Sequence, residues 1–245
     1  MNKKVFTFLI PCFNCDQFIF KNSLKLIKKI NQSKIHYKLM FLNDGSTDNT
    51  LAELKKIKLR KKIKIISFTN NSGKSTILKF ALKKCKDGIV ILYDCDLPYF
   101  KYLTKLIDSL KKGDKFVIID RRALDSKFDK SKLNFYQLSR YFISKCVNII
   151  ISNLIIKNFR GDTQSGLKGF YIDKKFKKQK FISTKFFLDA EIISYFTNKN
   201  VKVTSIPINY KISKQSSIKI LHLSNFVYLY ELMKIIIFGL VKFRN

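Results

Sequence analysis

The first half of the chain alternates short apolar runs with longer amphipathic stretches. The apolar runs at 5–10, 37–43, 62–68, 88–94 and 115–120 have the length of buried strands. The stretches between them, at about 17–31, 46–58, 73–85 and 98–112, have the apolar spacing of helices. Strands that alternate with helices in this way indicate βαβ units. We therefore expect an α/β fold with a mostly parallel sheet and helices on both faces.

The second half has a less regular pattern. It predicts a long helix at 132–156, a polar segment at 157–171, a helix at 186–196 and a strand at 201–210. The last part, 216–245, is apolar with sparse charges and approaches the length of a membrane span, but Glu231 and Lys234 interrupt it. We interpret 1–215 as one globular domain and 216–245 as an amphipathic helical tail at a membrane interface. The alternative is that the tail packs on the domain.

Composition adds a strong positive charge. The formal net charge is +32, with 49 Lys and Arg against 17 Asp and Glu. Coding bias toward A and T, which also favours Ile, Asn and Phe, would produce this excess without any partner. A functional origin would be attraction to a polyanion, either a nucleic acid or an anionic membrane surface.

The cysteines do not form a familiar metal or redox motif. One CxxC is present at 12–15, and a zinc or thioredoxin-type interpretation would need more ligands or another context. Free thiols in a reducing cytoplasm fit this pattern. The five cysteines are Cys12, Cys15, Cys85, Cys95 and Cys146.

Polar clusters follow four successive predicted strands. They are "PCFN" at 11–14, "NDGSTD" at 43–48, "NNSGK" at 70–74 and "DCD" at 94–96. Ligands of parallel sheets bind outside the carboxyl ends of the strands, so we expect these clusters to lie together. "NNSGKST" is not a P-loop, because Phe68 stands where that motif requires glycine. Gly73 and Lys74 could still bind a diphosphate, through amide N–H groups and a point charge.

Asp94 and Asp96 are the most informative pair. In an extended segment both carboxylates point the same way, and two such charges repel unless a cation lies between them. Ligation by oxygen alone suits Mg²⁺ or Mn²⁺. The sequence therefore predicts a divalent-metal site at this edge of the sheet.

The order of seven motifs resembles glycosyltransferase family 2, and within it the synthases that load glucose or mannose onto dolichyl or other polyprenyl phosphates. The motifs are "LIPCFN", "LNDGSTDNT", "NNSGK", "YDCDLP", "RGDTQSGLKGF", "FLDAEII" and "IPINY". The resemblance implies a Rossmann-like nucleotide-diphospho-sugar transferase fold of the glycosyltransferase A type over 1–215. It also implies metal at Asp94 and Asp96. The residues that it places at the nucleotide sugar are Pro11, Phe13, Asn14, Asp44, Gly73, Lys74, Asp94 and Cys95.

Four positions depart from the family pattern. Cys15 replaces a usual Glu, and Asn43 replaces the first Asp of "DDGS". Pro98 stands where mannose-type synthases often have Gln, which removes a possible metal ligand. "IDRR" replaces "GSR", so either Arg121 or Arg122 could face the acceptor phosphate.

The acceptor determines what the other site residues must do. A lipid phosphate is already anionic and needs positioning, whereas a sugar hydroxyl needs a base to take its proton. Arg140 and Ser144 lie on one helix face, a spacing that the polyprenyl-phosphate synthases share. The resemblance also places Gln164 at the active site. The catalytic candidates are Asp96, as the metal ligand beside the leaving group, and Asp162 or Asp189, as the base for a hydroxyl acceptor.

We therefore expect an inverting, metal-dependent hexosyltransferase of cell-envelope biogenesis that uses UDP- or GDP-hexose and a polyprenyl phosphate. We expect a cytoplasmic enzyme attached peripherally to an anionic membrane surface. The alternatives are transfer to a sugar hydroxyl, a basic nucleic-acid-binding module, and an inactive scaffold. No nucleic-acid partner is expected, because no recognition motif is present and that function leaves the strand-end acids unexplained.

Overall fold

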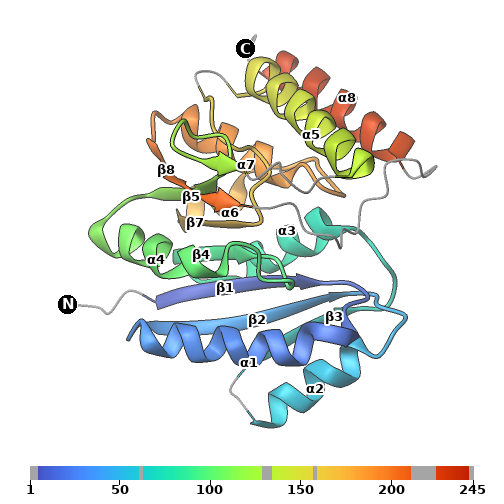
Figure 1. Ribbon diagram of the computed structural model, residues 1–245, viewed down its shortest axis with the longest axis vertical. Coiled ribbons are helices and arrows are strands. Elements are labelled where there is room, and N and C mark those ends of the chain that lie inside the picture. Colours follow the sequence, from blue (N-terminus) through green and yellow to red (C-terminus); the bar gives the residue numbers. More distant parts are fainter. Residues whose placement is uncertain (1–4, 61–62, 129–133, 157–158, 211–224, 243–245) are drawn as a thin grey trace.

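The protein is described by a computed structural model over residues 5–60, 63–128, 134–156, 159–210 and 225–242 (Figure 1). Each strand and helix expected in the first half is present. These elements are β1 (Val5–Cys12), α1 (Asp16–Gln32), β2 (His36–Asp44), α2 (Thr50–Arg60), β3 (Lys64–Phe68), α3 (Lys74–Lys84), β4 (Gly88–Tyr93), the 3₁₀ turn η1 (Phe100–Tyr102), α4 (Leu103–Lys112) and β5 (Phe116–Asp120).

The second half contains two strands that the sequence pattern did not predict, β6 and β7, and the expected last strand is divided into β8 and β9. The elements are β6 (Lys127–Phe128), α5 (Phe135–Leu154), β7 (Leu167–Ile172), α6 (Lys174–Lys178), α7 (Leu188–Thr197), β8 (Val203–Pro207), β9 (Asn209–Tyr210) and α8 (Asn225–Lys242).

Within the described residues the main sheet has seven strands in the order β3-β2-β1-β4-β7-β5-β8, and β6 and β9 form a separate pair. Every neighbouring pair in the main sheet is parallel except β4–β7 and β7–β5, which are antiparallel. The expected mostly parallel α/β sheet is confirmed. Because β7 runs against its neighbours, it begins at the edge where β4 and β5 end. The polar segment before β7 therefore lies at the ligand edge.

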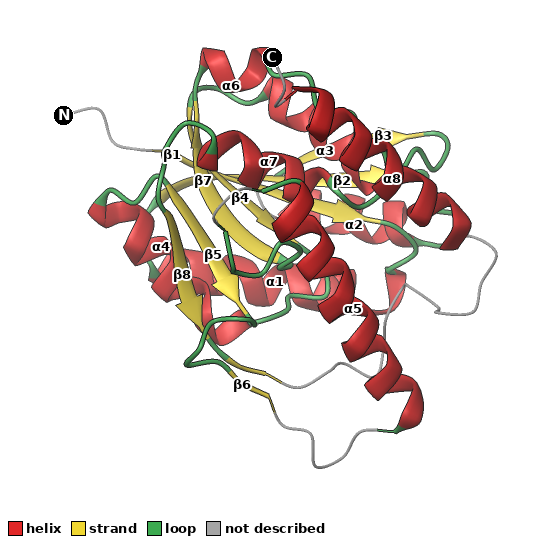
Figure 2. Ribbon diagram, turned by 90° about the horizontal axis from the view of Figure 1, so that it is seen from above, coloured by secondary structure: helices red, strands yellow, loops and turns green. Residues whose placement is uncertain are grey.

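Helices cover both faces of the sheet, and two hydrophobic cores result (Figures 1 and 2). Strand β4 contributes alternate side chains to the two cores. Ile89 and Ile91 belong to the core that includes α1, α2 and α4. Val90 and Leu92 belong to the core that includes α3, α5, α7 and α8. Successive side chains of a strand point to opposite faces, so a strand buried on both sides is continuously apolar.

Helix α8 packs on the domain along one face, beside α5 (Figure 1). Leu232 and Ile235 are buried in the core beneath it. Glu231, which we expected to interrupt a span, is also buried and accepts hydrogen bonds from the amides of Lys185 and Phe186 at 2.7 and 3.2 Å. Residues 216–224 and 243–245 of the predicted tail lie outside the described residues. Among the helices that the structure describes, none has the length and apolar character needed to cross a membrane.

Candidate active site

The turns after β1 and β2 are joined by hydrogen bonds. Asn14 donates its amide N–H to Ser46 Oγ at 3.1 Å, and its Oδ1 accepts from the Thr47 amide at 2.9 Å. Asn14 has a positive φ of 46°, a conformation that Asn tolerates better than most residues. Pro11 is half-buried and Phe13 is 46% exposed. Phe13 is therefore the residue of this turn that offers an apolar ring to a ligand.

Asp44 holds the loop before α3 in place. Its two carboxylate oxygens accept from the Ser72 amide and hydroxyl, at 2.9 and 2.8 Å, and from the Gly73 amide at 2.8 Å. The side chain is buried. Asp44 is thus committed to protein contacts, and a nucleoside would have to share it.

The amino terminus of α3 is already covered. The amides of Ser75 and Thr76 donate to the carbonyls of Lys185 and Thr184, at 2.9 and 3.1 Å. Gly73, with a φ of 97°, packs so closely on Thr184 that an added Cβ would lie 2.4 Å from its carbonyl oxygen. The Gly73 amide donates to Asp44, so the N–H groups of Gly73, Ser75 and Thr76 all have protein acceptors. The Lys74 ammonium, with three N–H groups, keeps donors for a diphosphate.

The turn after β4 carries the paired carboxylates. Lys74 Nζ lies 2.5 Å from Asp94 Oδ1, and the Asp94 amide donates to the Gly166 carbonyl at 3.1 Å. Gly166 has no room for a side chain, since a Cβ there would lie 2.7 Å from Asp94 Oδ2. Leu97 and Tyr99 both have positive φ, of 53° and 58°. Such backbone strain is typical of functional sites.

Asp96 is the freer carboxylate of the pair. Its side chain is exposed, and among the described residues no cation lies within ion-pair distance of it. Partial loss of hydration beside the surrounding protein and the negative charge of Asp94 raise the pKa of Asp96 to about 6. Asp94 and Asp96 provide only oxygen donors, which fits Mg²⁺ or Mn²⁺, with Asp96 the better ligand because Lys74 already pairs with Asp94.

A buried ion pair lies beside the partly exposed Lys74–Asp94 pair. Lys168 Nζ is 2.5 Å from Asp189 Oδ2, and both residues are buried. Burial lowers the pKa of Lys74, but Asp94 and Asp189 outweigh this and hold it above its ordinary value. Burial lowers the pKa of Lys168. The four side chains form a network of alternating charge in which Asp189 is paired and not free.

Asp162 forms a bidentate pair with Arg121. Arg121 donates from Nε to Oδ2 and from Nη2 to Oδ1, the latter at 2.9 Å. Burial raises the pKa of Asp162, but the Arg121 charge prevails and the pKa lies below its ordinary value. This arrangement favours a positioning role for Asp162 over the base role that we predicted. It also neutralises Arg121, which becomes the weaker candidate for an acceptor phosphate.

Arg122 is the stronger candidate. It donates from Nη2 to Ser144 Oγ at 3.0 Å, and its guanidinium lies 5.4 Å from the centre of the Tyr141 ring. Among the described residues it has no carboxylate partner, and its Nε is buried without a hydrogen bond. Arg122 and the predicted acceptor residue Ser144 therefore come together. Arg140 lies one turn earlier in α5, but its side chain is outside the described part of the structure.

Two further predicted residues lie at the same edge. Cys95 is partly exposed, and its carbonyl accepts from the Asn22 side chain at 3.0 Å. Gln164 is half-buried, and its amide donates to Asp162 Oδ1 at 3.0 Å.

Sequence reasoning missed three positioning residues. Asp120 accepts from the amides of Arg122 and Asp162, at 2.7 and 3.0 Å. Asn148 Oδ1 accepts hydrogen bonds from the amide and from the hydroxyl of Thr163, both at 2.8 Å. Lys168 pairs with Asp189 as described above. An acid that closes an apolar strand was a usable signal for Asp120, but nothing local marked the other two.

The family assignment follows from a direct comparison. The family model described as "Glycosyl transferase family 2" matches residues 7–176. This chain belongs to glycosyl transferase family 2. The expected membership is confirmed, and the match covers the strand-end motifs and both members of the Asp94–Asp96 pair.

Curated relatives of the family 2 chain are longer than it is. The putative glycosyltransferase CsbB of Bacillus subtilis (strain 168) is 29% identical over 153 residues, which is 61% of this chain and 45% of the relative. The dolichol-phosphate mannosyltransferase of Pyrococcus furiosus is 23% identical over 234 residues, 92% of this chain and 63% of the relative. The chain therefore spans about half the length of such relatives.

Solved structures confirm the glycosyltransferase A-type fold. Glucosyl-3-phosphoglycerate synthase from Mycobacterium tuberculosis, crystallised with Mn²⁺, UDP and phosphoglyceric acid, has a TM-score of 0.63 at 14% identity. That match covers 98% of this chain and 78% of the other. S. aureus TarS 1–349 with UDP-GlcNAc has a TM-score of 0.62 at 16% identity, over 96% and 66%. At such identities the likeness concerns the fold.

Proposed function

We propose that this family 2 protein is a metal-dependent inverting glycosyltransferase that moves a hexose from UDP- or GDP-hexose to a polyprenyl phosphate. One observation carries the choice of acceptor. The two carboxylates that could serve as a general base, Asp162 and Asp189, are both buried and paired with cations. A phosphate acceptor is anionic at neutral pH and needs no base.

The donor would lie along the carboxyl ends of β1, β2 and β4. The exposed ring of Phe13 is suited to contact the nucleobase. Lys74 supplies a positive charge toward the diphosphate. Asp94 and Asp96 suit Mg²⁺ or Mn²⁺, and a bound ion would supply further positive charge beside the leaving nucleoside diphosphate.

The acceptor phosphate would be held by Arg122 and Ser144. Within the part of the chain that the structure describes, the Arg122 guanidinium has no carboxylate partner, and a guanidinium can donate two parallel hydrogen bonds to a phosphate. The phosphate oxygen would attack the anomeric carbon from the side opposite the leaving group, so the configuration would invert. The resemblance to a dolichol-phosphate mannosyltransferase over 92% of the chain supports this choice.

A membrane surface would deliver such an acceptor. Helices α5 and α8 lie side by side and expose apolar side chains, and an anionic bilayer suits them because the chain carries a formal charge of +32. This would place the protein peripherally on the cytoplasmic membrane face. The exposed residues include Phe142, Ile143 and Ile149 on α5 and Tyr230, Met233 and Ile237 on α8.

Activity is tested with purified protein, Mn²⁺ or Mg²⁺, a panel of nucleotide sugars and a short polyprenyl phosphate. We expect a glycolipid product, at least about 100-fold less of it with Asp96→Ala, and about 10- to 100-fold less with Arg122→Ala because a charge-assisted contact is lost. Lys111→Ala, an exposed cation on α4, is the matched control and should keep full activity. No turnover with any acceptor would contradict the proposal.

The acceptor class is tested separately. Polyprenyl phosphate, the corresponding polyprenol and soluble sugars are compared as acceptors with the same donor. Transfer only to the phosphate supports the proposal. If the protein transfers to sugar hydroxyls and this transfer is lost in Asp189→Asn, the alternative is favoured. In that alternative Asp189 separates from Lys168 and acts as the base.

Membrane attachment is tested by flotation with anionic and neutral vesicles. The protein should float with the anionic vesicles, and Tyr230→Glu combined with Met233→Glu should reduce flotation. Leu59→Glu is the matched control, since Leu59 is 89% exposed on α2, at the opposite end of the molecule from α8 (Figure 1). Equal flotation of all variants would contradict docking through α8.

A further inference from the structure

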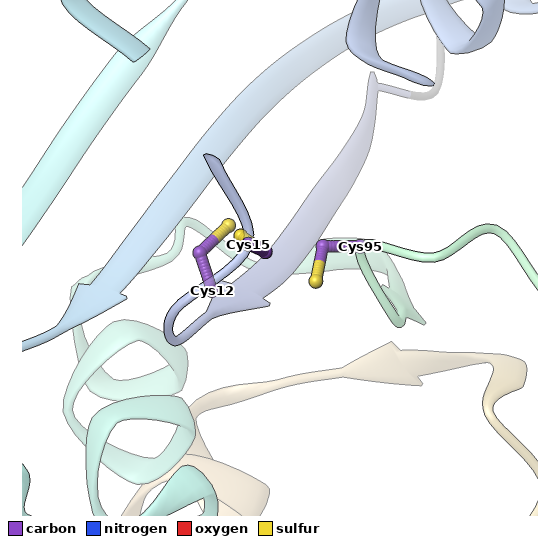
Figure 3. Close-up of side chains that lie close together, drawn as sticks. All are labelled: Cys12, Cys15 and Cys95. Atoms are coloured by element: carbon purple, nitrogen blue, oxygen red, sulfur yellow. The ribbon is translucent and has the colours of Figure 1, made fainter. Parts of the chain in front are cut away.

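Three cysteine side chains meet beside the paired carboxylates. The Sγ atoms of Cys12, Cys15 and Cys95 all lie within 4.8 Å of one another (Figure 3). Cys12 and Cys15 are buried, whereas Cys95 is partly exposed. Cys12 ends β1, Cys15 precedes α1, and Cys95 stands between Asp94 and Asp96 in the turn after β4. The fold thus supplies the third thiol that the lone CxxC lacked.

The surrounding protein holds these cysteines from several elements. The Cys15 amide donates to Thr50 Oγ1 at 2.8 Å, and that hydroxyl also lies 3.7 Å from Cys15 Sγ. Asn22, on α1, donates to the Cys95 carbonyl at 3.0 Å. The Cys12 thiol contacts the Ile10 carbonyl at 3.4 Å. Such outer contacts fix the ligands of protein metal sites.

We propose that Cys12, Cys15 and Cys95 form a binding site for a thiophilic metal ion, Zn²⁺ under cellular conditions. In a tetrahedral zinc site, Zn–S bonds of about 2.3 Å place the sulfur atoms about 3.8 Å apart. The observed cluster needs a contraction of about 1 Å at most to reach that spacing. Zinc would be bound as three thiolates with release of their protons, and the fourth position would hold water.

This site is chemically distinct from the carboxylate pair. Thiolates select Zn²⁺ and other soft ions, whereas Asp94 and Asp96 select Mg²⁺ or Mn²⁺. Zinc in the three-cysteine site would join the turn after β1 to the turn after β4. Those turns carry Phe13 and the paired carboxylates, so the soft ion would fix their relative position. The inference does not depend on the acceptor of the proposed reaction.

Reduced, metal-free protein is titrated with Cd²⁺, a zinc substitute whose thiolate complexes absorb in the ultraviolet. We expect one Cd²⁺ per chain, a charge-transfer band of the intensity given by three thiolates, and its displacement by Zn²⁺ but not by excess Mn²⁺. Cys12→Ser, Cys15→Ser and Cys95→Ser should each weaken binding by at least about tenfold. Cys146→Ser, which removes an exposed thiol outside the cluster, is the matched control and should bind as the unmodified chain does.

Cys95→Ser keeps the test decisive if the buried variants fail to fold, since Cys95 is partly exposed. Zn²⁺ should raise the Tm of the unmodified chain and of Cys146→Ser, and raise it less in Cys95→Ser. The proposal is overturned if Cd²⁺ gives no thiolate band. It is equally overturned if Cys95→Ser binds Cd²⁺ with the affinity and band intensity of the unmodified chain, or if Asp96→Ala loses the band while Cys95→Ser keeps it in full.

Discussion

The ammonium of Lys74 lies 2.5 Å from a carboxylate oxygen of Asp94, and this contact joins the start of α3 to the end of β4. Strands β2 and β1 separate β3, which precedes Lys74, from β4 in the sheet. The pair therefore exists only because the fold brings two distant strand ends together. It also leaves Asp96 as the carboxylate that is available to a cation.

Replacing Lys74 with Met should have opposite effects on two ligands. Loss of the ammonium removes a competitor for Asp94 and makes the local electrostatic potential more negative. Mn²⁺ should therefore bind several-fold more tightly in the absence of nucleotide. Binding of UDP or GDP should weaken by about tenfold or more, because the diphosphate loses the positive charge of the Lys74 ammonium. Titrations followed by the electron paramagnetic resonance of Mn²⁺ and by calorimetry measure the two affinities. Lys83→Met, on the same helix but exposed, is the control.

Mn²⁺ affinity should depend on pH around the pKa of Asp96, which is about 6. Below that value the carboxyl holds a proton that the ion must displace, so affinity should fall by about tenfold per pH unit as the pH drops from 6 to 5, and should level off above 7. In metal-free protein, folding stability depends on pH in the opposite direction. Because the folded pKa of Asp96 lies above the unfolded value of about 3.9, its contribution to stability is fully present below about 3.9 and is lost as the pH rises through 6. Asp96→Asn should remove both effects. A Mn²⁺ affinity that is constant between pH 5 and 7 would contradict this assignment.

Asp162→Asn should destabilise the fold. The half-buried Arg121 guanidinium would lose its counter-charge, at a cost of about 3 kcal/mol in the free energy of unfolding at pH 7. The lowered pKa of Asp162 sets the pH dependence: its contribution is fully present above the unfolded value of about 3.9 and is lost as the pH falls through the lower folded value. Urea unfolding at several pH values measures this. The unmodified chain should lose more stability on acidification than Asp162→Asn does, and equal losses would argue against the assignment.

Gly166→Ala should impair the site with little effect on folding. The added methyl would meet Asp94 Oδ2 at 2.7 Å and Pro98 Cγ at 2.9 Å, so the turn after β4 must shift. We expect Mn²⁺ affinity to fall by about tenfold or more, with only a few degrees of change in Tm. Gly113→Ala serves as a stability control, because Gly113 has a φ of 110° but no neighbour within 4 Å of an added Cβ. A normal Mn²⁺ affinity in Gly166→Ala would show that the turn tolerates the displacement.

The first half of the fold was predictable because its signals are local. Continuous apolar strands such as 88–93 and the amphipathic helices between them report burial on both faces of a parallel sheet. Polar residues at the strand ends then had to meet at one edge, which is where Asp44, Asp94 and Asp120 lie. The prediction did not require knowing the strand order.

Strand β7 was missed because its local pattern misleads. It follows a polar segment and contains Lys168, a cation that is rarely buried. Only the tertiary structure supplies Asp189 as its partner and places the strand antiparallel between β4 and β5. The role of Glu231 in the tail was likewise not visible in the sequence. In the sequence Glu231 only indicates that the tail is a poor membrane span, whereas in the fold it accepts hydrogen bonds from the loop at 183–186.

The sequence by itself determined the α/β class, the family resemblance and the edge of the sheet at which the chemistry belongs, because periodicity and strand-end residues are properties of short segments. The tertiary structure decided which charges are already paired. Arg121 is engaged by Asp162, whereas Arg122 has no carboxylate partner among the described residues, although the two arginines are neighbours in the chain. It also brought Cys95 to Cys12 and Cys15. Pairing depends on distances between residues far apart in sequence, and only packing of the helices and strands sets those distances.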